Sequence, residues 1–148
     1  METMALDEMR AAHRVLAALD YLPGRVERGY AGRTLHVDVS ANRIETRPVT
    51  EYMKDRFTGG KGFDLYLMWH SIPGPIAWDD PRNGLYFSAG PLGGTPYFSG
   101  SGKCLVTGIS PTTGSVMDSN VGGHFGPLLK FAGFDALGVR GKAFGFVV

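Results

Sequence analysis

The sequence predicts an α+β fold of antiparallel strands and a few short helices, preceded by an amphipathic N-terminal helix. Three observations support this prediction. Apolar residues recur at helical spacing over residues 4–22, apolar and polar residues alternate over residues 34–39, and two strand-like segments flank a turn at residues 111–114. With 148 residues and 43% hydrophobic content, the chain is long enough for one domain with its own core.

The N-terminal segment is expected to be a helix over residues 4–22 that ends before Pro23 and Gly24. Its apolar stripe needs a partner surface, either the domain behind it or another subunit. We therefore divide the chain into a helical extension, residues 1–28, and a main domain, residues 29–148.

The main domain is expected to begin with a hairpin, in which residues 35–39 form a half-buried strand and residues 43–47 a second one. Thr50 then has the position of a helix N-cap, and Gly59 and Gly60 close the short helix that follows.

A second apolar helix is expected over residues 63–72, with Phe63, Tyr66 and Trp69 packed on the sheet. A short strand over residues 85–90 leads into a glycine-rich loop, residues 91–102. A loop of this kind is expected to wrap a ligand or to pass beneath another domain.

The next segment is expected to form a hairpin and then a glycine-rich entry into a helix. Residues 103–110 and 115–120 read as its strands. Gly122 and Gly123 follow, Pro127 suits the first turn of a helix, and Gly133 is expected to cap that helix. Bare backbone before a helix offers N–H groups to an anion such as a phosphate. A tight packing turn is the alternative interpretation of the same glycines.

The last part of the chain is expected to contain a strand over residues 134–141 and the start of a further strand over residues 144–148. Because the sequence stops within that apolar strand, we expect the domain to be truncated at its C-terminal end or completed by another chain.

Composition excludes several classes of function. A formal net charge of +1 provides no basic stripe for nucleic acid. The single cysteine, Cys104, permits no internal disulfide and favours a reducing compartment. No apolar run approaches the roughly 18–20 residues of a membrane span, and the N-terminus lacks the apolar core of a signal peptide. We therefore expect a cytoplasmic protein without a membrane segment.

Recognisable catalytic motifs are absent from the sequence. There is no P-loop, no HExxH and no CxxC, and the histidines are scattered singly. Asp79 and Asp80 adjoin in a proline-containing turn, where they do not face each other across a pocket. Any metal in this protein must therefore be held by something other than its side chains.

Five segments of the main domain resemble the N-terminal domain of the aldehyde ferredoxin oxidoreductase family. They are GRTLHVDVSANRIE, TGGKGFDLYL, AGPLGGT, SGKCLVTGISPTTG and SNVGGHFGPLLKFAGFDALGVRGKA. In that family the domain is a saddle of antiparallel sheets that carries a tungsten bis-pterin cofactor, with the metal held by pterin dithiolene sulfurs. The resemblance therefore implies a saddle-like domain, a tungstopterin or its molybdenum equivalent, and no protein ligand to the metal.

The resemblance also implies roles for individual residues. Asn120 matches the family's asparagine near the pterin phosphates and a bridging magnesium ion, and Gly122 and Gly123 match the glycines after it. Lys103 falls where the family often has a cofactor-contacting arginine, and lysine keeps the charge but loses the bidentate fork. His124 follows the glycines and either reaches the same phosphate or packs locally.

Other parts of the family's machinery lie outside this sequence. The cysteines of the 4Fe-4S cluster, the second pterin-binding segment and the acid/base residues belong to later domains. The expected partners are therefore those domains, or a separate chain that carries the cysteines, together with ferredoxin; oligomerisation is left open. No catalytic residue is assigned here, and we expect the isolated chain to be inactive.

Three functions stay open from the sequence. The first is the cofactor-binding portion of an enzyme that oxidises aldehydes to carboxylic acids with ferredoxin as acceptor. The second is a catalytic-subunit fragment of a benzoyl-CoA reductase type enzyme. The third is a non-enzymatic binding or assembly protein that retains only the saddle.

Overall fold

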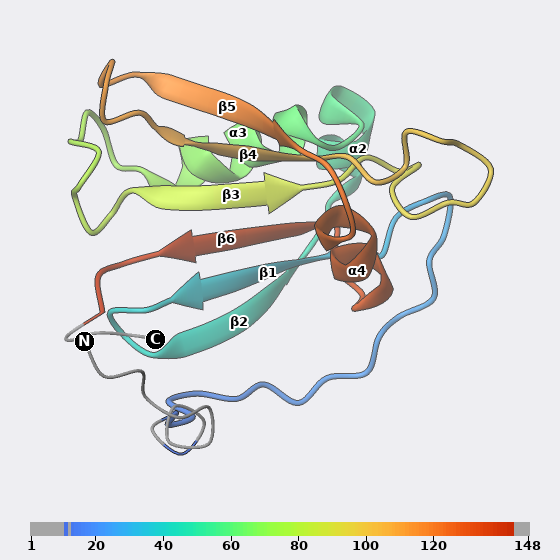
Figure 1. Cartoon of the computed structure of the whole chain (residues 1–148), viewed down its shortest axis with the longest axis horizontal. Helices are drawn as coiled ribbons and strands as arrows, with labels where there is room; N and C mark the ends of the chain where they lie inside the picture. The colour runs from blue at the N-terminus through green and yellow to red at the C-terminus, as the bar shows by residue number, and fades with distance from the viewer. Residues whose placement is uncertain (1–10, 12, 144–148) are drawn as a thin grey trace, which may run out of the picture.

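The computed structural model describes residue 11 and residues 13–143, which form one sheet with helices against it (Figure 1). The elements run in the order β1 (Arg33–Asp38), β2 (Arg43–Pro48), α2 (Glu51–Phe57), α3 (Lys61–Ser71), β3 (Gly84–Ser88), β4 (Cys104–Ile109), β5 (Val116–Val121), α4 (Phe125–Phe131) and β6 (Ala136–Arg140). The α+β class predicted from the sequence is confirmed.

The sheet has six strands in the order β2-β1-β6-β3-β4-β5. Neighbouring strands are antiparallel except β1 and β6, which run parallel with Leu35 opposite Leu137. The sheet is therefore mixed, where the sequence predicted antiparallel pairing throughout. The difference arises because β6 inserts between the first hairpin and β3, a long-range pairing that no local pattern encodes.

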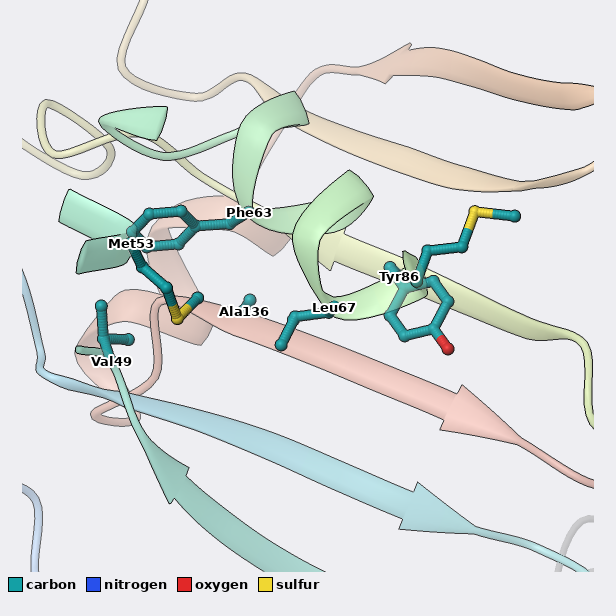
Figure 2. Close-up of a cluster of buried hydrophobic side chains, with 7 residues drawn as sticks. Val49, Met53, Phe63, Leu67, Tyr86 and Ala136 are labelled. Carbon is teal, nitrogen blue, oxygen red and sulfur yellow. The ribbon is translucent and has the colours of Figure 1, made fainter. Parts of the chain in front are cut away.

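Helices α2 and α3 lie on one face of the sheet, and α4 lies at one end of it (Figure 1). The buried side of α3 packs mainly on β3 and β4. Figure 2 shows the apolar cluster beneath these helices, whose buried members are Val49, Met53, Phe63, Leu67, Met68, Tyr86 and Ala136.

Local signals in the sequence placed several elements correctly. The Thr50 hydroxyl accepts a hydrogen bond from the Met53 N–H at 3.2 Å and so caps α2. Both predicted hairpins are present, β1 with β2 and β4 with β5. Gly133 follows α4 with a φ of 91°, the left-handed conformation that commonly ends a helix.

The expected N-terminal helix does not extend through residues 13–22, although residue 11 is helical. Residues 13–26 have no helix, whereas residues 1–10 and 12 lie outside the described residues. Tyr21 explains the extended path, because its hydroxyl donates to the Ala132 carbonyl at 2.8 Å and its ring packs 4.9 Å from that of Phe134. These contacts to the main domain override the helical pattern, since a short helix is marginal on its own.

Trp69 was expected to pack on the sheet and is instead 82% exposed. The buried residues of α3 are Phe63, Asp64, Leu67 and Met68, and Trp69 lies outside this stripe. The expected strand at residues 144–148 lies outside the described residues. None of the described helices is long and apolar enough to cross a membrane.

Candidate functional site

The predicted site residues gather at the open end of the β4–β5 hairpin. Cys104 begins β4 and pairs with Val121 at the end of β5. Lys103 therefore directly precedes one strand, and Gly122 directly follows the other. We call residues 103, 120 and 122–124 the glycine corner.

The backbone of the glycine corner is open to solvent. Gly122 and Gly123 are exposed, and a Cβ built at either position meets no atom within 4 Å. Gly123 has a φ of 101°, a conformation that glycine adopts without strain. Within the described part of the chain, no backbone hydrogen bond uses the N–H of Gly122, Gly123 or His124. These N–H groups are thus available to an external acceptor.

The side chains at the corner are polar and exposed. Lys103, Asn120 and His124 are each exposed, and Lys103 forms no ion pair with the residues that the structure describes. His124 occupies the N-cap position of α4, yet its side chain makes no capping hydrogen bond. The corner therefore combines a cation, an amide and free backbone donors, which together suit an oxyanion.

Glycines outside the predicted site hold the corner in place by close packing. A Cβ at Gly102 would lie 2.8 Å from the Gly123 carbonyl oxygen, and one at Gly126 would lie 3.1 Å from the Cys104 Cβ. Gly94 belongs to the same loop as Gly102 and packs against Phe131 of α4. The density of glycine after residue 90 was the only signal in the sequence for these contacts.

Asp64 is a buried carboxylate beneath the sheet that the sequence analysis also overlooked. It is fully buried, its Oδ2 accepts from the Thr107 hydroxyl at 3.2 Å, and its Oδ1 has no hydrogen-bond partner in the described part of the chain. Burial raises the pKa of this carboxyl to about 7, although the hydroxyls of Ser88 and Thr107 oppose the rise. Burial likewise raises the pKa of the Cys104 thiol. The Asp64 carboxyl and the Cys104 thiol are both buried, so they belong to the core and are not exposed at the corner.

A second polar feature, a cleft of about 120 Å³, lies at the opposite ends of the strands. It is lined by His36, Arg47 and Arg140 among others. Desolvation and the nearby Arg47 lower the pKa of His36 to about 4, so this imidazole is neutral at physiological pH. Its Nε2 lies 2.9 Å from the Thr34 hydroxyl oxygen.

Metal-ligating side chains do not converge in residues 13–143, where no group of three His, Cys, Asp or Glu residues lies close enough to hold an ion. The described corner also lacks a nucleophile paired with a base. The described residues of the corner are therefore suited to binding an anion.

Comparison with known proteins identifies the relatives of this chain. Residues 34–148 match the model of the aldehyde ferredoxin oxidoreductase N-terminal domain. A tungsten-containing aldehyde ferredoxin oxidoreductase from Pyrococcus horikoshii is 39% identical over 115 residues, which cover 78% of this chain and 19% of the relative. The WOR-like subunit of an aliphatic sulfonate oxidoreductase from Pyrococcus furiosus is 32% identical over 117 residues, covering 77% and 18%.

Among solved structures, the active site complex BamBC of benzoyl coenzyme A reductase, in complex with 1,5 dienoyl-CoA, has a similar fold. The match has a TM-score of 0.73 and 33% sequence identity, and it covers 78% of this chain and 18% of the chain it matches. This chain thus spans about a fifth of the length of the relatives it matches.

Proposed function

Because this chain belongs to the aldehyde ferredoxin oxidoreductase family, whose N-terminal domain it matches over residues 34–148, we propose that it is the cofactor-binding portion of a tungsten bis-pterin oxidoreductase. In this proposal the complete enzyme, containing tungsten or the molybdenum equivalent, oxidises aldehydes to carboxylic acids with ferredoxin as electron acceptor. The observation that carries the proposal is the juxtaposition of the Lys103 cation with the open backbone of Gly122 and Gly123.

The residues of the glycine corner fit a pterin phosphate. A doubly charged phosphate needs several donors, and the free N–H groups of Gly122 and Gly123 supply them without a Cβ in the way. Lys103 supplies the positive charge next to the same backbone. A lysine binds phosphate as a point charge, so it loses the bidentate geometry that an arginine would provide.

Two further residues are assigned supporting roles. The Asn120 side-chain amide is exposed beside the corner, and amide oxygens are suitable ligands for a magnesium ion that bridges phosphates. His124 is exposed after the glycines and is assigned to the rim of the phosphate site. The corner positions the cofactor, and no residue of this chain is assigned to proton transfer.

When bound, the tungsten or molybdenum centre supplies the two-electron oxidation. The remaining parts of the enzyme must supply the second pterin-binding segment and a 4Fe-4S cluster, because Cys104 is this chain's only cysteine and is buried. Those parts lie on later domains or on a separate chain. The isolated 148-residue chain is accordingly proposed to be inactive.

A second candidate is a subunit fragment of a benzoyl-CoA reductase type enzyme. It is favoured by the structural relative, whose matched chain belongs to an active site complex of such an enzyme. Both candidates use this domain in the same way and differ in the substrate that the complete enzyme receives.

The test is to purify the chain together with the polypeptides that complete the enzyme and to measure tungsten, molybdenum and pterin. We expect metal and pterin only in the complex, with pterin content lowered by Lys103→Ala and unchanged by Lys142→Ala, an exposed lysine distant in the sequence. Unchanged pterin content in the Lys103→Ala complex would contradict the assignment of Lys103 to phosphate binding. A stable protein that never acquires metal in any complex would instead favour a binding or assembly function.

A further inference from the structure

Among the residues that the structure describes, strand β5 is an edge of the sheet with backbone groups available for pairing. It lies last in the strand order, after β4, and its residues 116–120 are exposed. The Ser110 N–H donates to the Ser115 carbonyl at 2.9 Å next to the pair Ile109 and Val116. Because bonded and non-bonded pairs alternate along an antiparallel ladder, the residues bonded to β4 are Met117, Ser119 and Val121.

The alternate residues of β5 therefore point their N–H and C=O groups away from the sheet. These residues are Val116, Asp118 and Asn120. The pairing of β3 supports this assignment. The Ala89 N–H donates to the Asp135 carbonyl beside β6, so by the same alternation the N–H and C=O groups of Tyr86 and Ser88 point toward β4. An edge of this kind accepts an additional strand.

An apolar groove begins where β5 begins. It has a volume of about 930 Å³ and lies between the C-terminal half of α3, the loop after it and the turn of the β4–β5 hairpin. Its lining includes Leu65, Trp69, Ile72 and Val116, of which Trp69 is 82% exposed and Val116 is 54% exposed. Large apolar side chains exposed together in this way mark an interaction surface.

We propose that β5 is the docking edge for an extended segment from the part of the enzyme that this chain lacks. The segment adds a strand beside β5 through the outward groups of Val116, Asp118 and Asn120, and it places an apolar side chain in the groove beside Trp69. This inference rests on the proposed function, since it takes the partner to be the remainder of the family enzyme. Beyond the proposed function, it identifies β5 as the surface to which the rest of the enzyme attaches and strand pairing as the mode of attachment.

The alternation of a strand predicts what the docking segment looks like. Residues opposite Val116 and Asp118 point to the same face of the sheet as the groove. Val116 borders the groove, whereas Asp118 is paired with Lys61 at 2.6 Å. The segment should therefore carry an apolar residue at the Val116 end and a polar residue beside Asp118.

A second copy of this chain is a poorer occupant of the edge. The symmetric antiparallel register that uses all three outward residues places Asp118 opposite its own copy, and like charges directly opposite each other are destabilising. The remainder of the enzyme has no such conflict. It is also large enough, because this chain accounts for only 19% of the length of the Pyrococcus horikoshii relative.

The test uses the 148-residue chain and, as the probe, the intact polypeptides that complete the enzyme. Amide hydrogen exchange is measured before and after mixing. We expect the amides of Val116, Asp118 and Asn120 to become protected and the Trp69 fluorescence to shift to the blue, measured in a Trp78→Phe background. Failure of the probe to bind, or binding that leaves these amides unprotected, would overturn the proposal.

Proline substitution separates edge pairing from other modes of contact. Asp118→Pro removes an outward N–H, so the fold should persist by circular dichroism while binding weakens about tenfold or more. Asp118→Ala loses the same carboxylate but keeps the N–H, and it should bind within about threefold of the parent chain. Met117→Pro removes an N–H bonded to β4 and should lower the melting temperature instead.

Two results would contradict this scheme. Equal binding by Asp118→Pro and Asp118→Ala would exclude backbone pairing at this edge. Protection of the three amides by self-association, seen as a dimer in sedimentation, would assign the edge to a second copy. Neither measurement depends on cofactor, so loss of pterin on Lys103→Ala tests the proposed function separately.

Discussion

Lys130 and Asp135 form an ion pair in which the side chains are only 3% and 0% exposed. Asp135 also accepts hydrogen bonds from the N–H groups of Ala31 and Gly32, at 3.0 and 2.7 Å, and the Lys130 ammonium donates to the Gly29 carbonyl at 2.8 Å. The pair therefore joins the segment before β1 to the turn between α4 and β6. It anchors the starts of β1 and β6, the parallel pair inside the sheet.

The first prediction concerns this buried pair. Lys130→Met should lower the free energy of unfolding by about 3–5 kcal/mol, because it leaves the Asp135 carboxylate buried without its counter-ion. Lys61→Met is the control, since the exposed Lys61–Asp118 pair should contribute about 1 kcal/mol or less. Urea unfolding of both variants measures the difference. Equal losses would mean that the backbone donors of Ala31 and Gly32 alone satisfy Asp135.

The second prediction concerns the pH dependence that Asp64 imposes. Burial raises its pKa from 3.8 to about 7, so between these values the folded protein keeps a proton that the unfolded chain has released. The contribution of Asp64 to the free energy of unfolding therefore falls as the pH rises from 3.8 to 7 and stays low above pH 7. Asp64→Asn mimics the protonated form. It should leave stability unchanged near pH 4 and raise it by about 2–4 kcal/mol at pH 8.

Urea unfolding at the two pH values tests this prediction. Thr107→Val is the matched variant, because it removes the hydroxyl that donates to Asp64 Oδ2 and should destabilise more at pH 8 than at pH 4. A stabilisation by Asp64→Asn that is the same at both pH values would contradict a titrating carboxyl.

The third prediction concerns His36, whose titration acts in the opposite direction. Desolvation and Arg47 lower its pKa from 6.5 to about 4, so the unfolded chain binds a proton between these values that the folded protein does not. Stability from this group is therefore complete above pH 6.5 and is lost as the pH falls toward 4. Nuclear magnetic resonance of the imidazole should give a midpoint near pH 4. Arg47→Met should move that midpoint upward, and an unmoved midpoint would leave desolvation and the smaller effect of Arg140 as the causes.

Features of the fold that depend on neighbouring residues could be predicted from the sequence. The Thr50 cap, the turn at residues 111–114 and the left-handed Gly133 each follow from a few adjacent residues. The parallel pairing of β1 with β6 could not be predicted, because it joins residues about a hundred positions apart. The helix expected over residues 4–22 failed at residues 13–22 because Tyr21 packs on the main domain.

At the candidate site, too, some features could be predicted from the sequence and others could not. The juxtaposition of Lys103 with Gly122 and Gly123 follows from the hairpin, since a correct turn sets the register of both strands. Asp64 could not be recognised as a buried titrating group, because an acidic residue in an amphipathic helix usually faces solvent. Trp69 was assigned to the core for the corresponding reason, since helical spacing alone does not say which stripe faces the sheet.

The fourth prediction separates the two interpretations of the glycines at the corner, a ligand cradle and a tight packing turn. Gly122 has an ordinary φ and no atom within 4 Å of a built Cβ, so Gly122→Ala should change the free energy of unfolding by no more than about 0.5 kcal/mol. It should nevertheless reduce pterin retention, because the added methyl group occupies the space through which a phosphate reaches the backbone N–H groups. Gly126→Ala is the contrasting variant.

At Gly126 a Cβ would lie 3.1 Å from the Cys104 Cβ and 3.3 Å from the Lys103 carbonyl oxygen, so Gly126→Ala should destabilise the chain by about 1–3 kcal/mol through overpacking. The two variants are compared by urea unfolding of the chain and by pterin content of the complex. A packing turn at Gly122 would make the first variant as unstable as the second. A ligand cradle makes it stable and poor in cofactor. We expect this result because, chain neighbours aside, no described atom lies within 4 Å of a Cβ built at Gly122, whereas atoms of Cys104 and Lys103 crowd one built at Gly126.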